Sequence, residues 1–217
     1  MATRDVHLEQ FDRLAGLLAR ASREASAAIR EASRGLLAAD RDAAAAVLAG
    51  QPARESLHRE IDEAVPLLLV RRQPVASDLR LVVAAIRMNT DMMRMSTLAC
   101  HIARIARARY PACAVPPTAR QVLTAMADTA ARLAEKASVV LATRDPIDAL
   151  QMDLDDDEID ALETQLFILL AEDWPHGVEA AVDVAMLGRF YERIADHAVG
   201  IARRVAYLVV GPPAAEL

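Results

Sequence analysis

The sequence predicts an all-α protein built as two tandem three-helix bundles. Its 217 residues include only 7 Gly and 10 Pro, yet 54% of them are hydrophobic. Runs such as AAAAVLA at 43–49 favour helix, because Ala and Leu lose little side-chain entropy there. The stretch YPACAVPPT at 110–118 holds three prolines, which cannot continue a helix. We therefore expect a first repeat over residues 1–110 and a second over residues 117–212.

Three helical segments are expected in the first half, with a further short segment between the first and the second. They are a helix from about Val6 to Leu37, a short one ending at Ala49, one ending near Arg71 and a long one ending near Arg109. Asp40 and Asp42 are candidate N-caps for the short segment, since a carboxylate can accept from the free amides of a first turn. Gln73-Pro74 marks the turn before the long helix.

Three helical segments are expected in the second half. They run from Thr118 to Ala142, from Asp145-Pro146 to about Ala171, and from the turn EDWPHG (172–177) to about Val210. Asp145 followed by Pro146 is typical of an N-cap with proline in the first helical position. Gly211-Pro212 is a stop signal for the last helix.

The two halves are similar to each other in sequence. LHREIDEAV (57–65) resembles DDEIDALET (156–164), and the residues around Arg94 resemble those around Arg193, an offset of 99. Self-similarity at one fixed offset is typical of a duplicated unit. We therefore expect each copy to form one three-helix bundle.

Composition also bounds the function. The net charge of −6 argues against a nucleic-acid binder, which normally carries a basic surface. Two isolated cysteines, Cys100 and Cys113, are too few for a disulfide framework and fit reduced thiols. The N-terminal residues lack the apolar core of a signal peptide, and no stretch approaches 18 uninterrupted apolar residues. We expect a cytoplasmic protein that meets a membrane only through partners.

Two acids, Glu192 and Asp196, lie four residues apart in the last predicted helix, where they repel each other by about 0.2–0.5 kcal/mol. A helical wheel gathers the apolar residues of this helix into one stripe, which comprises Phe190, Ile194, Ala198, Ile201, Val205 and Leu208. The two acids fall on the opposite face, so we expect them to point outward. Pairing with Arg189 and Arg193 would make this an ordinary solvated charged face.

A second acid pair, Asp156 and Asp160, has the same spacing on the preceding helix. If the two helices pack as neighbours, four carboxylates would converge. Carboxylate oxygens favour hard or borderline cations such as magnesium, calcium, manganese or iron.

Two longer stretches resemble the PhoU family. RRQPVASDLRLV (71–82) and YERIADHAVGIARRVAYLVVG (191–211) are similar to the family's two signature strings, and the resemblance covers nearly the whole chain. It implies a pair of three-helix bundles, cytoplasmic and often dimeric. It also implies a negative regulator of phosphate uptake and two-component signalling, coupling the ATPase of a phosphate ABC transporter to a sensor histidine kinase.

The resemblance further implies multinuclear metal binding through motifs of the form E/D-x-x-x-D. These motifs are intact in the second half, at Asp156 with Asp160 and at Glu192 with Asp196. We therefore expect iron, manganese, zinc or magnesium in the second repeat only.

The first half departs from that pattern. In MMRMST (92–97), Met93 and Thr97 stand where the family has Glu and Asp. His58 stands at the start of the other motif, and only Asp62 remains of the four acids. We expect no metal cluster in the first bundle.

Met93 is a candidate contact residue. A helical wheel gives this helix an inward stripe of Met88, Met92, Met95 and Ile102. Met93 points to the opposite side, either as a scattered surface apolar residue or as part of a partner or dimer face.

The segment RRQPVASDLR supplies further candidate partner residues. Asp78 lies near a helix start, where the helix dipole favours an acid. Arg71, Arg72 and Arg80 leave a positive spot on an acidic protein, suited to an acidic partner or phosphate. An architectural role for the whole segment is the alternative.

Three function classes compete. An adaptor, which acts by binding other proteins, is favoured, and we expect no catalytic residues. A carboxylate-bridged metalloenzyme would need two E-x-x-H motifs aimed into the core, whereas only Glu55 with His58 is present. A DNA-binding regulator conflicts with the acidic balance and lacks an evident helix-turn-helix.

Overall fold

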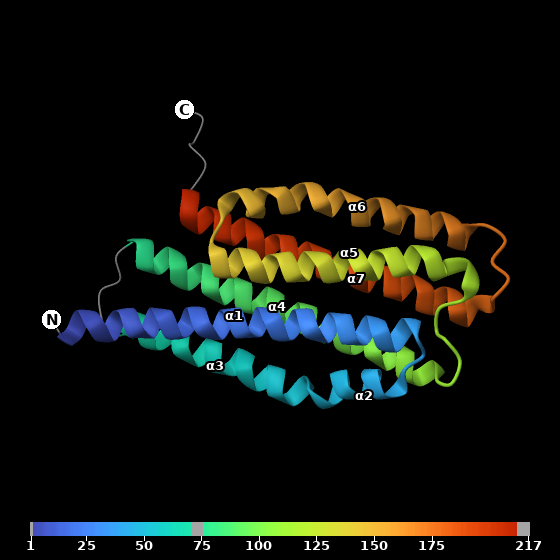
Figure 1. The fold of residues 1–217 in the computed structure, drawn as a ribbon, viewed down its shortest axis with the longest axis horizontal. Coiled ribbons are helices and arrows are strands. Elements are labelled where there is room, and N and C mark those ends of the chain that lie inside the picture. Colours follow the sequence, from blue (N-terminus) through green and yellow to red (C-terminus); the bar gives the residue numbers. More distant parts are fainter. Residues whose placement is uncertain (1, 71–75, 212–217) are drawn as a thin grey trace.

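The computed structural model describes residues 2–70 and 76–211, and every regular element within them is an α-helix (Figure 1). The helices are α1 (Ala2–Leu37), α2 (Arg41–Ala49), α3 (Gln51–Val70), α4 (Ala76–Arg109), α5 (Pro117–Thr143), α6 (Pro146–Ala171) and α7 (Gly177–Val210). The all-α prediction is confirmed, and each predicted helix is present with ends shifted by a few residues at most.

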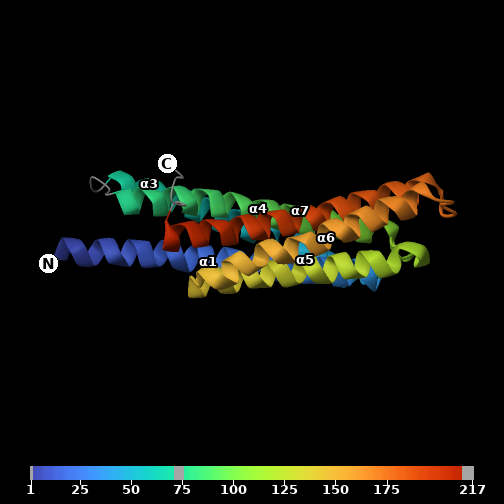
Figure 2. The same cartoon turned by 90° about the horizontal axis from the view of Figure 1, so that it is seen from above.

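The long helices run roughly along one axis and form two bundles (Figures 1 and 2). Helices α1, α3 and α4 pack together in the first, with the short α2 against α1 and α4, and helices α5, α6 and α7 pack together in the second. The bundles join where α1 packs on α5 and α4 packs on α7. Buried apolar side chains from both halves form one continuous core, so the repeats are packed against each other.

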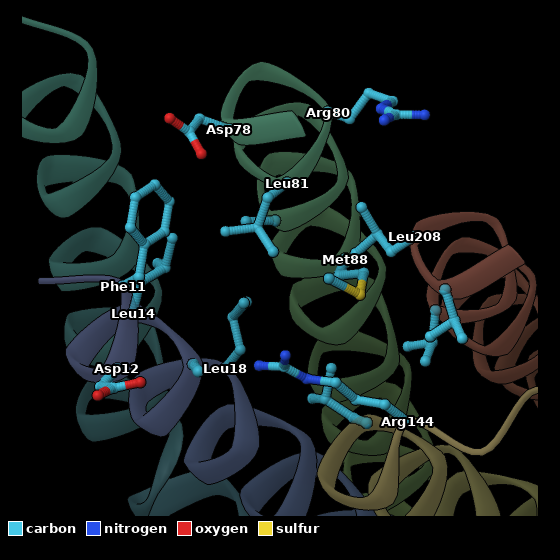
Figure 3. Close-up of a pocket in the computed structure, with 15 residues that line it drawn as sticks. Phe11, Asp12, Leu14, Leu18, Asp78, Arg80, Leu81, Met88, Arg144 and Leu208 are labelled. Atoms are coloured by element: carbon cyan, nitrogen blue, oxygen red, sulfur yellow. The ribbon is translucent and has the colours of Figure 1, made fainter. Parts of the chain in front are cut away.

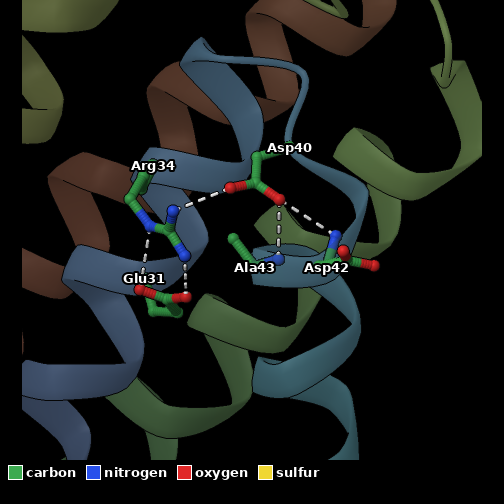
Figure 4. A network of polar contacts seen from close by, with 5 residues as sticks. All are labelled: Glu31, Arg34, Asp40, Asp42 and Ala43. Atoms are coloured by element: carbon green, nitrogen blue, oxygen red, sulfur yellow. Dashed lines mark hydrogen bonds and ion pairs between the residues drawn. The ribbon is translucent and has the colours of Figure 1, made fainter.

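The start of α2 shows how local sequence sets a helix boundary (Figure 4). Asp40 is the N-cap: its Oδ1 accepts from the backbone amides of Asp42 and Ala43, each at 3.0 Å. The Ala43 hydrogen bond is the main cause that lowers the pKa of Asp40. Arg34 donates to the other oxygen of Asp40 at 2.7 Å and is held by Glu31. Of the two candidate caps, the structure therefore selects Asp40.

The second-half boundaries follow the same local rules. Asp145 caps α6 by accepting from the amide of Ile147 at 2.8 Å, and Pro146 occupies the first helical turn. Helix α7 ends at Gly211, whose φ of 86° is left-handed backbone that glycine adopts without strain.

Buried side chains tie the halves together. The predicted inward residues of α4 are all buried, namely Met88, Met92, Met95 and Ile102. Tyr191 of α7 is fully buried and donates to the hydroxyl of Ser33 on α1 at 3.0 Å. This bond crosses from one repeat to the other, because its partners lie 158 residues apart.

Candidate functional site

Glu192 lies at the seam between α6 and α7, where its side chain faces Glu163 of α6 and Asp196 of its own helix. Only 8% of Glu192 is exposed, so the prediction that it points outward is wrong, whereas Asp196 is exposed as expected. The reason is the close approach of α6 one turn earlier. Gly188 leaves room for Leu166, whose Cδ2 would lie 2.4 Å from a Cβ at that position.

Burial and like charge dominate the electrostatics of this seam. The pKa of Glu192 is raised to about 7, mainly by burial and then by the charge of Asp196, with a smaller contribution from Glu163. Arg189 opposes this, since its Nη1 lies 2.8 Å from Glu192 Oε2 and 3.6 Å from Glu163 Oε1. The predicted Arg189–Glu192 pair is therefore present, although the carboxylates outnumber this arginine.

The two predicted acids of α6 lie less centrally. Asp160 is exposed, and Asp156 is half-buried with a polar contact of its own. Among the side chains that the structure describes, which leave out residues 2–8, 69–70, 76–77 and 153–154, no three His, Cys, Asp or Glu are arranged to hold a metal ion. That Asp156, Asp160, Glu192 and Asp196 converge on one cation therefore stays a prediction. Sequence reasoning missed Glu163, which follows Asp160 by three residues and so lies on the same side of α6.

The matching seam of the first half, between α3 and α4, holds a hydrogen-bonded network. Buried His58 and Asn89 share a hydrogen bond of 2.7 Å between Nδ1 and Oδ1. The Asn89 amide also donates to Asp62 Oδ1 at 2.8 Å and to the His58 carbonyl at 3.1 Å. His58 is thus held as a packed polar residue, and sequence reasoning missed its partner Asn89.

Met93 and Thr97, at positions where the family resemblance led us to expect acids, lie on the outer face of α4. Met93 is 39% exposed, which confirms the orientation expected from the wheel. The Thr97 hydroxyl donates to the Met93 carbonyl at 2.9 Å, so it is satisfied within its own helix.

A pocket of about 440 Å³ opens where the ends of α1, α4, α5 and α7 meet (Figure 3). Its walls are mostly apolar, and its charged residues are Asp12, Asp78, Arg80 and Arg144. Arg144 reaches into the pocket from the end of α5, whereas Asp78 and Arg80 diverge from the first turn of α4 (Figure 3). The predicted partner residues Arg71 and Arg72 lie outside the described residues.

A buried ion-pair network joins α4 to α7. Asp91, only 8% exposed, accepts from Arg204 at 2.5 Å and lies 3.0 Å from His197 Nδ1. Near the other end of the same interface, Arg109 pairs with Asp183 at 2.5 Å. These contacts fix the two bundles in register, and sequence reasoning missed them because the partners lie far apart along the chain.

None of the helices, over the residues that the structure describes, is both long and apolar enough to cross a membrane.

Comparisons with known proteins relate the whole chain to one family. The sequence model of the PhoU domain matches twice, at residues 18–106 and 123–205. The phosphate-specific transport system accessory protein PhoU homolog 2 of Mycobacterium tuberculosis is 40% identical over 96% of this chain and 98% of its own length. The PhoU homolog 1 of Mycobacterium leprae is 38% identical over 96% of this chain and 94% of its own length. The crystal structure of PhoU from Pseudomonas aeruginosa superposes with a TM-score of 0.86 at 26% identity, covering 94% of this chain and 99% of that one.

Proposed function

Because the chain belongs to the PhoU family, we propose that it is a phosphate-transport accessory protein that restrains phosphate uptake and two-component phosphate signalling. In this role it acts in the cytoplasm as an adaptor between the ATPase of a phosphate ABC transporter and a sensor histidine kinase. The observation that carries the proposal is end-to-end similarity to proteins named as phosphate-specific transport accessory proteins.

The side chains of a possible metalloenzyme site also fit an adaptor better than an enzyme. The E-x-x-H pair that a helical metalloenzyme would use is split: Glu55 is exposed and bonded by Gln51 at 2.7 Å, while His58 is buried against Asn89. Asp91, the buried acid at the bundle interface, is occupied in an ion pair with Arg204.

Deletion of the gene tests this role. In cells with ample phosphate, we expect the deletion to raise phosphate uptake and the expression of phosphate-uptake genes, with wild-type complementation restoring both. Purified protein should retain the kinase or the transporter ATPase from a mixture of the two purified candidates. Unchanged uptake and gene expression in the deletion strain would contradict the proposal.

We assign the partner contact to the terminal pocket and its charged residues, Asp78, Arg80 and Arg144, together with Arg71 and Arg72 of the same signature segment. A pocket with apolar walls and a charged rim suits an apolar anchor with polar neighbours. Arg144→Glu should weaken retention of the partner at least tenfold. Arg23→Glu makes the same charge change on an exposed part of α1 and should have no effect, and equal loss in both variants would exclude the pocket.

We further propose that the α6–α7 seam binds a cation through Glu192 and Asp196, with Asp156 and Asp160 turning inward to join them. All-carboxylate ligands suit magnesium or manganese, and the family resemblance adds iron and zinc as candidates. The burial of Glu192 among other acids supports the assignment, since a bound cation would offset that repulsion. Binding requires side-chain rotation, because three ligands do not converge in the described geometry.

Metal analysis after dialysis against each metal tests this assignment. The double substitution Glu192→Ala with Asp196→Ala should remove the bound metal, whereas Glu24→Ala with Asp157→Ala, at exposed positions, should not. Equal metal content in the two variants would contradict the site. The homodimer implied by the family resemblance stays a prediction, which sedimentation equilibrium tests directly.

A further inference from the structure

The outer face of α4 carries a regular line of side chains. We call it the α4 seam, and it consists of Leu79, Val83, Ile86, Thr90, Met93 and Thr97. The steps along it alternate between four and three residues, which is the spacing of the a and d positions in a coiled-coil heptad. The seam spans about 27 Å at about 1.5 Å per residue.

All six side chains are exposed, and the seam presents an apolar surface. The exposed fractions of the four apolar side chains lie between 39% at Met93 and 48% at Leu79. The hydroxyls of Thr90 and Thr97 donate to carbonyls one turn earlier, at 3.0 and 2.9 Å, so they are satisfied within the helix. Single exposed apolar residues are normal on a protein surface, but six positions in heptad register have the spacing on which a facing helix packs.

One flank of the seam is basic. Arg80, Arg87 and Arg94 follow each other at intervals of seven residues and are all exposed. None of the three forms an ion pair with a described residue. The two acids of α4 do not neutralise them, because Asp78 is already engaged and Asp91 is buried with Arg204. Among the described residues this basic row thus has no ionic partner, on a chain whose net charge is −6.

A groove runs beside this row, between α4 and the end of α7. It is lined by Leu79, Arg80, Val83, Ala84, Arg87, Arg204 and Tyr207. On its other flank the seam adjoins α3, where Asp62 accepts a hydrogen bond from Asn89. The positive side of the seam is therefore the side that faces α7.

We propose that the α4 seam docks an amphipathic helix of a partner protein, whose acidic side chains lie along the flank that faces α7. The heptad spacing selects a helix, because a and d side chains pack as knobs into the holes of a facing helix. The row of Arg80, Arg87 and Arg94 selects acids, because charges at flanking positions set partner choice. This inference rests on the proposed adaptor role and names the kind of element that the adaptor binds.

Two other occupants fit the surface less well. Antiparallel packing of α4 on the α4 of a second copy would place one arginine row against the other, and like charges at close range disfavour that pairing. An anionic membrane would attract the arginines, but it does not fill a groove between two helices or select heptad spacing.

A designed peptide probes the surface. The probe is a 21-residue helix with Leu at the a and d positions and Glu at the flanking positions, and fluorescence anisotropy measures its binding. We expect binding that weakens at least tenfold in the triple variant Arg80→Glu, Arg87→Glu, Arg94→Glu. The same variant should gain binding of a second peptide in which Lys replaces Glu. The double variant Ile86→Asp, Met93→Asp should lose both, while circular dichroism shows it folded.

Matched controls separate this surface from charge in general. Arg20→Glu, Arg23→Glu and Arg59→Glu reverse three other exposed arginines and should leave binding of the acidic peptide unchanged. A peptide of the same composition with scrambled spacing should bind at least tenfold more weakly than the probe. Equal binding of the regular and scrambled peptides, or by the wild-type protein and the arginine variant, would overturn the proposal.

The other occupants give distinct outcomes. A wild-type dimer in light scattering that Ile86→Asp, Met93→Asp converts to monomer would show that a second copy covers the seam. Cosedimentation with phosphatidylglycerol vesicles without peptide binding would show that a membrane does, and either result overturns the proposal. Failure of the inference is distinguishable from failure of the adaptor role. If the deletion raises uptake but the arginine variant restores repression fully, the docking surface is wrong and the adaptor role stands.

Discussion

Substitution of Glu192 by Gln in metal-free protein should stabilise the fold at alkaline pH. Gln keeps the shape of the side chain and removes the charge that burial and Asp196 disfavour. The pKa of Glu192 is raised from 4.5 to about 7, so the folded state holds a proton that the unfolded state has lost between those values. The free energy of unfolding of the wild type should therefore fall as pH rises from 4.5 to about 7.

The size of the effect follows from the same two values. The gap between 4.5 and about 7 corresponds to about 3 kcal/mol at about 1.36 kcal/mol per pKa unit. This is an upper limit, because Asp196 and Glu163 share the titration and Arg189 relaxes toward whichever carboxylate is charged. We expect Glu192→Gln to be about 1–2 kcal/mol more stable than the wild type at pH 8. Below pH 4.5 the two proteins should be equally stable.

Urea unfolding in the presence of a chelator, at several values between pH 4.5 and pH 8, measures this difference. Asp157→Asn removes an exposed carboxylate from the same helix pair and should track the wild type throughout. If Glu192→Gln were less stable than the wild type at pH 8, the Arg189 ion pair would outweigh the burial of the charge. The electrostatic account of the seam would then be wrong.

Three substitutions test the packing by urea unfolding. Asp40→Ala removes the N-cap of α2 and should cost about 1 kcal/mol, with no loss indicating that the cap is dispensable. Tyr191→Phe breaks the bond to Ser33 between the repeats and should cost about 0.5–1.5 kcal/mol, whereas a neutral result would mean that water replaces it. Gly188→Ala forces Leu166 away from α7 and should cost about 1–3 kcal/mol; an unchanged midpoint would show that Leu166 has a free alternative rotamer.

The seam between α6 and α7 shows where inference from sequence reached its limit. A wheel gives the direction of each side chain relative to its own helix, and it correctly placed Met93 outward and Met92 inward. It placed Glu192 outward as well, because the wheel does not contain the neighbouring helix. The approach of α6 over Gly188 encloses that side of α7, and only the packed structure shows it.

The sequence by itself determined where the helices lie, because the residues that start and end a helix act on their near neighbours. Asp40, Asp145 and Gly211 act within a few residues of the boundaries they set, and the proline-rich stretch at 110–118 separates the repeats. The heptad spacing of the α4 seam is likewise a property of one segment, since it depends only on the order of residues.

Tertiary structure alone decided which charges meet. Asp91 contacts His197, which lies more than a hundred residues away in the sequence. Asn89 of α4 shares a hydrogen bond with His58 of α3. Tertiary structure also decided that Arg80, Arg87 and Arg94 remain without ionic partners among the described residues. The physical reason is that backbone hydrogen bonds and caps are satisfied between near neighbours, whereas the burial of a side chain and its ionic partner depend on which helices pack together.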